Sequence, residues 1–143
     1  MDPGTERHRR QVNSVMNTRM LVSPLGVVLG AFDLMIGVWA FLAPESFFAK
    51  VGPYPPFNVH YVHDVGAFQF GLGVGLLCGI RRPAVLFAAA AANAAAAVVH
   101  VGAHVEDRHL GGHTYDIPGL VIIAVLSLVL VWSAASASER DHP

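Results

Sequence analysis

Charged residues are scarce in this chain: they make up 13% of its 143 residues, whereas 54% of the residues are hydrophobic. A soluble globular domain carries about 25% charged residues, so this chain has too few of them to cover itself with a polar surface. The net charge of -1 gives no electrostatic reason to expect nucleic acid as a partner. The single cysteine, Cys78, excludes an internal disulfide. The lipid bilayer is therefore the expected environment.

Four apolar segments are each long enough to cross a ~30 Å hydrocarbon core, which takes about 20 helical residues. They cover residues 22–43, 59–80, 83–105 and 117–135. Asn58 and Asp116 are placed to cap the second and fourth segments. We predict an all-α integral membrane four-helix bundle over residues 21–136, with a basic disordered or interfacial tail at 1–20 and a short tail at 137–143.

The basic residues outside these segments indicate the orientation. The N-terminal arginines, the Arg81-Arg82 turn and Arg140 belong to one side, and only Lys50 and Arg108 belong to the other. The positive-inside rule therefore places both termini in the cytoplasm, an N-in/C-in arrangement. A cleaved signal peptide is the alternative for the first segment, but that segment is long and carries Asp33 at its centre. High alanine and glycine contents favour a bacterial inner membrane protein of a GC-rich organism.

Glycines recur at helical spacing in the first two segments. Gly26, Gly30 and Gly37 share a stripe in the first, and Gly71, Gly75 and Gly79 repeat every four residues in the second. Small residues at this spacing let helices approach closely in lipid. They predict tight contacts inside the bundle, with a partner in a membrane complex, or in a homo-oligomer.

Two further segments are expected to have structural roles. Residues 46–58 are expected to form a loop, because they hold three prolines and a glycine. Their aromatic side chains indicate that this loop lies along the membrane surface. The fourth apolar segment has no ionisable residue and is expected to be a structural wall that faces lipid.

Histidine is the anomaly of the composition, with eight residues in a short apolar chain. His60, His63 and Asp64 begin the second segment, while His100 and His104 end the third and share one helical face. The orientation places all five at the extracytoplasmic surface. His109, His113 and Asp116 lie in the loop just above them. We predict one outer polar layer with the imidazoles of the second and third segments turned toward each other.

Three interpretations of this layer remain open. His60, His63, Asp64, His100 and His104 are the candidate ligands of a transition metal, because imidazole with carboxylate suits iron, copper, zinc or manganese. A non-covalent haem b held between facing histidines is the second interpretation. In the third, the histidines and acids form hydrogen-bonded pairs that hold the helix ends together. Deeper in the membrane, Asp33 and Asn93 are expected to hydrogen-bond across the midplane.

One motif resembles known proteins. The run His63-Asp64-Val65-Gly66-Ala67, continued by Leu72-Gly73, is similar to uncharacterised actinobacterial membrane proteins. The four short helices, with a Pro-Glu pair after the first, also resemble the DoxX-like family. This resemblance implies a compact four-helix bundle that works beside an oxidoreductase or a quinone, and it transfers no catalytic residue. The expected function is metal or redox-cofactor binding, with a non-catalytic accessory subunit or a haem-binding protein as alternatives.

Overall fold

The computed structural model of the chain describes residues 3–138, with the side chains of Glu6 and residues 24–137. It contains helices α1 (Pro3–Leu42), α2 (Pro44–Lys50), α3 (Val59–Gly79), α4 (Pro83–Glu106) and α5 (Asp116–Ser138). No strand occurs within these residues. Four stretches are long and apolar enough to cross a membrane, and they are Pro24–Leu42, Val59–Gly79, Pro83–Glu106 and Asp116–Ala137. The predicted all-α class and the four predicted segments are confirmed.

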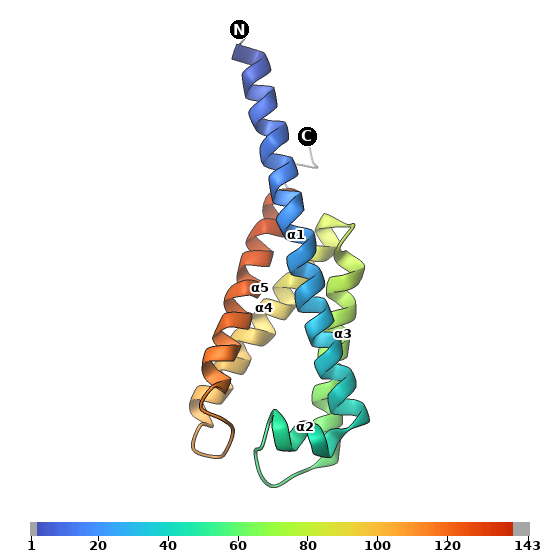
Figure 1. Cartoon of the computed structure of the whole chain (residues 1–143), viewed down its shortest axis with the longest axis vertical. Helices are drawn as coiled ribbons and strands as arrows, with labels where there is room; N and C mark the ends of the chain where they lie inside the picture. The colour runs from blue at the N-terminus through green and yellow to red at the C-terminus, as the bar shows by residue number, and fades with distance from the viewer. Residues whose placement is uncertain (1–2, 139–143) are drawn as a thin grey trace.

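Helix α1 begins earlier than the sequence predicted. Residues 3–20 were expected to be a separate tail, but they continue the helix without a break. No proline or glycine occurs between Thr5 and Ser23, so nothing in this stretch interrupts a helix. Figure 1 shows the first part of α1 projecting beyond the other helices. Of the short tail predicted at 137–143, residues 139–143 lie outside the described part of the chain.

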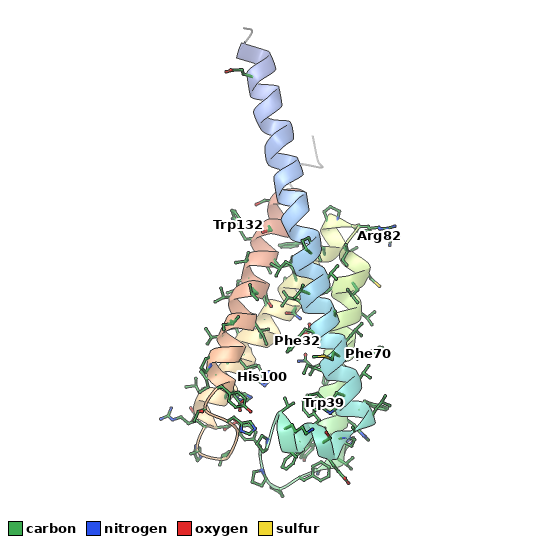
Figure 2. All side chains as sticks on the ribbon, viewed as in Figure 1. Phe32, Trp39, Phe70, Arg82, His100 and Trp132 are labelled. Atoms are coloured by element: carbon green, nitrogen blue, oxygen red, sulfur yellow. The ribbon has the colours of Figure 1, made fainter. Side chains whose placement is uncertain are left out.

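The four long helices form a ring in which α1 contacts α3, α3 contacts α4, α4 contacts α5, and α5 returns to α1. The closest neighbours are α1 with α3 and α4 with α5, so the bundle consists of two helix pairs. The two pairs converge at the end of the bundle that holds the α3–α4 turn, which we call the terminal end (Figure 1). They separate at the end that holds α2 and the α4–α5 loop, which we call the loop end. Arg82 and Trp132 lie toward the terminal end (Figure 2).

Glycines bring α1 and α3 into backbone contact. A Cβ on Gly37 would lie 2.6 Å from the backbone nitrogen of Phe70, and one on Gly73 would lie 2.7 Å from the carbonyl oxygen of Gly30. Gly66 makes an equally close approach to α1, with 2.9 Å from its virtual Cβ to the Gly37 carbonyl oxygen. None of these three positions tolerates a side chain, as expected for close helix packing in lipid.

The glycine stripe predicted on the second apolar segment is therefore partly wrong. A Cβ on Gly71 would meet nothing within 4 Å, and one on Gly75 would make ordinary contact with Ala89. Gly66 and Gly73 are the residues that face α1, because a spacing of seven returns to the same helical face after two turns. Gly79 does pack closely, but against Leu86 of α4 and not against α1.

An apolar core closes the terminal half of the bundle. It consists of buried side chains from all four long helices, namely Leu29, Leu76, Leu86, Ala90, Leu130 and Ala134. Leu76 and Leu130 have no exposed surface. This half of the bundle is therefore filled by side chains.

Helix α2 occupies part of the segment that was expected to be a loop. Pro44 takes the first helical position, where its missing N–H costs nothing, and the helix continues to Lys50. Phe47 turns inward and is buried with Ala40 of α1 and Val62 of α3. Its ring meets that of Trp39 edge to face, with 5.9 Å between the ring centroids. Thus α2 is anchored to the α1/α3 pair across the loop end.

Candidate functional site

The two helix pairs enclose a cavity in the loop-end half of the bundle. It has a volume of about 480 Å³, within the range of pockets that hold small molecules. Helix α2 and residues 51–58 close one side, and α4 and α5 form the opposite wall. Much of the lining is apolar, from side chains such as Phe47, Val62, Val65, Leu120 and Ile123. The cavity is therefore a largely apolar pocket with a few polar side chains in its lining.

Four of the polar side chains in the lining gather at one place, and we call them the mouth cluster: Tyr54, His100, His104 and Asp116. The Tyr54 hydroxyl lies 3.1 Å from Nδ1 of His104. Nε2 of His104 lies 3.0 Å from Nε2 of His100. An Asp116 carboxylate oxygen is 4.0 Å from Nδ1 of His104. The two histidines are one helical turn apart on α4, so both present their rings to the cavity, and Figure 2 shows His100 on the side of α4 that faces the other helix pair.

The loops position Tyr54 above His104. Gly112 has a φ of +82° in the left-handed region that favours glycine, and a Cβ there would lie 2.6 Å from the Tyr54 hydroxyl. The Gly112 N–H donates a hydrogen bond of 3.3 Å to the carbonyl oxygen of Pro53. The Asp116 carboxylate accepts the His113 N–H at 2.6 Å. Asp116 thus ties its loop back to the start of α5, where the sequence predicted a helix cap.

The protonation state of Tyr54 sets a direction for this chain of hydrogen bonds. Burial raises the pKa of its hydroxyl, and the nearby negative charges of Asp116 and Asp107 raise it further. The hydroxyl therefore keeps its proton at neutral pH and donates to Nδ1 of His104. In the tautomer of His104 that carries its proton on Nε2, Nδ1 accepts from Tyr54 and Nε2 donates to Nε2 of His100. The mouth cluster is a continuous row of exchangeable protons.

A smaller inner chamber of about 130 Å³ continues toward the middle of the bundle. Six residues line both it and the cavity above, and they are Phe47, Val51, Val65, His100, Leu120 and Ile123. Asp33, Gln69 and Asn93 line the inner chamber but not the cavity above it. The mouth cluster and the polar groups at mid-membrane depth therefore border two adjoining spaces that share these six residues.

Asp33, Asn93 and Ser127 link three helices near the centre of their spans. The Asn93 side-chain amide donates to Oδ2 of Asp33, which confirms the hydrogen bond predicted between these residues. The Ser127 hydroxyl lies 2.8 Å from Oδ1 of Asn93 and 2.8 Å from the carbonyl oxygen of Ile123, so it donates to one or the other. All three side chains are buried, with 4% or less of their surface exposed.

The structure does not bring His60, His63 and Asp64 to this cavity. His60 lies 3.7 Å from Asp64 in an exposed pair on the surface of α3. The His63 ring packs against Phe41 of α1, with 4.8 Å between centroids. The cause is the rotation of α3: Gly66 and Gly73 must face α1, and this turns the face of His60 and Asp64 outward. The polar residues that were expected to form one outer layer therefore do not form one group, because those of α3 lie away from the cavity.

The loop histidines have local partners. A ring nitrogen of His109 lies 3.2 Å from the carbonyl oxygen of Glu106, one turn earlier. The His113 ring stacks on that of Tyr115, with 4.8 Å between centroids and 13° between planes. Of the loop residues that were predicted, only Asp116 joins the mouth cluster.

The arrangement does not support the predicted metal site. Among the side chains that the structure describes, Glu6 and residues 24–137, no three of His, Cys, Asp or Glu are placed to hold a metal ion. The predicted haem would take its axial ligands from facing helices, but His100 and His104 stand on one helix, and the histidines of α3 have other neighbours. The geometry supports hydrogen bonding by the mouth cluster instead.

Three residues that the sequence did not single out contribute to the site. Tyr54 was noted only as one aromatic in a proline-rich stretch, and its link to His104 spans 50 positions. Ser127 lies in the helix that was expected to be a lipid-facing wall, yet that helix lines the cavity through Leu120 and Ile123. A hydroxyl in the middle of an apolar helix was the available signal for Ser127. Gln69 gave a similar signal in α3.

Comparison with protein-family models, with curated proteins and with solved structures finds no match to this chain. The resemblance to DoxX-like proteins stays a prediction. The geometry of the site alone therefore carries the functional argument.

Proposed function

We propose that this protein is a bacterial inner membrane protein that binds a small amphipathic molecule in the cavity at its loop end. The observation that carries the proposal is the make-up of that cavity: a largely apolar pocket of about 480 Å³ in which four polar side chains gather in the mouth cluster. Pockets of this kind bind the body of a ligand by burial and orient it through a few polar contacts.

The chemistry of the lining defines the ligand class. Phe47, Val62 and Val65 offer an apolar surface to a flat or hydrocarbon body. The ring of His100 offers an N–H group to an acceptor such as a carbonyl oxygen, because its Nε2 accepts from His104 and its own proton is then on Nδ1. A lipid-soluble quinone has both features, and it is the redox cofactor that we propose in place of a metal ion.

The alternative of an accessory subunit has weaker support. Of the glycines that suggested an external helix partner, Gly30 and Gly37 pack inside the chain against α3 and Gly79 packs against α4. Gly71 meets open space. Ligand binding is therefore the better-supported function.

Binding of a short-chain quinone to the purified protein in nanodiscs tests the proposal. Trp39 packs on Phe47 at the cavity wall, so its fluorescence reports occupancy when Trp132 is replaced by Phe. His100→Leu should weaken binding roughly fivefold or more, because one hydrogen bond is worth about 1 kcal/mol.

His60→Leu is the matched control, since His60 lies at the same end of the molecule but outside the cavity. It should bind the quinone as the wild type does. No saturable binding to the wild type, or an equal loss in both variants, would contradict the proposal.

A further inference from the structure

We infer that Asp33 is a proton-exchange site that communicates with the loop-end surface through the inner chamber and the cavity above it. This inference goes beyond ligand binding, because it concerns the empty protein. It rests on three observations: a carboxyl group at mid-membrane depth, two adjoining spaces that reach it from one end, and a closed core on its other side.

The first observation is the position of Asp33. It is the central residue of the membrane-spanning stretch Pro24–Leu42, and 3% of its surface is exposed. A carboxyl group at that depth is costly unless it is paired, neutral or hydrated, and such residues commonly mark proton or ion pathways. Asn93 supplies one hydrogen bond, but an amide carries no charge that would neutralise a carboxylate.

The second observation is access. Asp33 lines the inner chamber, and His100 lines both this chamber and the outer cavity. Asn93 and His100 are seven residues apart on α4, about 10 Å along the helix axis. The chamber volume of about 130 Å³ has room for several water molecules. Protons can therefore pass between the mouth cluster and Asp33 by way of water.

The third observation is that the pathway ends there. From Asp33 to the terminal end the bundle is filled by apolar side chains, including Leu29, Leu76 and Leu130. Exchange is thus confined to the loop end, which makes this a half-channel and not a through-pore.

Two groups in the lining of the inner chamber would respond to pH. Of the residues that line the inner chamber, only Asp33 and His100 titrate. Gln69 of α3 and Asn93 of α4 are polar but neutral, and α2 and α5 contribute apolar side chains there. A proton taken up in the chamber is therefore bound by the carboxylate of Asp33 or by the ring of His100.

Infrared spectroscopy of the ligand-free protein in nanodiscs tests the inference. The carboxylic acid C=O band of Asp33 is the one lost in Asp33→Asn, a substitution that keeps the shape of the side chain. We expect this band to disappear as pH is raised and to shift rapidly when H₂O is replaced by D₂O. If no such band exists at any pH, or if it ignores both pH and D₂O, Asp33 is a static link between helices and the inference is overturned.

A pair of alanine substitutions tests the route. Ala97 lines the inner chamber, so Ala97→Leu should slow the D₂O shift roughly tenfold or more by filling it. Ala95 is exposed on α4 and lines neither space, so Ala95→Leu should leave the rate unchanged. Equal rates in both variants would overturn the proposed route. Because no ligand is added, a failure of quinone binding would not affect either result.

Discussion

An unpaired polar side chain at the centre of a bilayer destabilises the folded protein, and Asp33 and Asn93 avoid this by pairing with each other. The Asn93 amide donates to the carboxyl group, while its own oxygen lies within hydrogen-bonding distance of the Ser127 hydroxyl. Removing one member of such a pair leaves a buried polar group unsatisfied, whereas removing both with apolar replacements is nearly neutral. The pair therefore behaves as a unit.

This coupling gives a double-mutant prediction. Asn93→Leu alone should lower the free energy of unfolding by about 1–3 kcal/mol, and so should Asp33→Leu. The double variant should recover most of that loss, because no unpaired polar group remains. Unfolding by a denaturing detergent in mixed micelles measures all three. If the double variant loses the sum of the two single effects, the residues do not form a coupled pair.

The residue types at the site could be recognised from the sequence, but their contacts could not. The imidazoles of His100 and His104 were expected to act together because a spacing of four places them on one face. Tyr54 was not expected beside them, since its position depends on the close approach of two loops at Gly112. Long-range contacts of this kind leave no local pattern.

At the scale of the helices, the contact between α1 and α3 decides what α3 can present to the cavity. With Gly66 and Gly73 turned to α1, Val62, Val65 and Gln69 face the space between the helix pairs. The lengths of the helices follow from composition, which is why all four membrane segments were predicted. The rotation of α3 depends on which of its several glycines meet α1, and spacing alone selected Gly71 and Gly75.

Alanine substitution distinguishes the two sets of glycines. Gly37→Ala should destabilise the bundle by about 1–3 kcal/mol, because its Cβ would overlap the backbone of Phe70. Gly71→Ala has open space around it and should be neutral or stabilise α3 by up to about 1 kcal/mol through higher helix propensity. Thermal unfolding of both variants provides the comparison, and equal destabilisation would mean that α3 packs through the face of Gly71.

At the scale of the whole molecule, the bundle is closed at one end and hollow at the other. The apolar core joins the two helix pairs at the terminal end, while α2 and the loops bridge them around the cavity at the loop end. If the positive-inside orientation holds, this cavity opens to the extracytoplasmic side. Such an arrangement lets a molecule from the outer half of the membrane enter without opening a path across it.

Two open glycine positions allow the cavity itself to be tested. Neither Gly119, which lines the cavity from α5, nor Gly71, on the outer face of α3, has an atom within 4 Å of a virtual Cβ. A phenylalanine at either position therefore meets no steric clash at its Cβ, but only the one at 119 fills the cavity. The most direct measurement is quinone binding by Gly119→Phe and Gly71→Phe in nanodiscs, followed by Trp39 fluorescence in the Trp132→Phe background. We predict that Gly119→Phe abolishes binding while Gly71→Phe binds as the wild type does. Unchanged binding in Gly119→Phe would show that the cavity between the helix pairs is not the binding site.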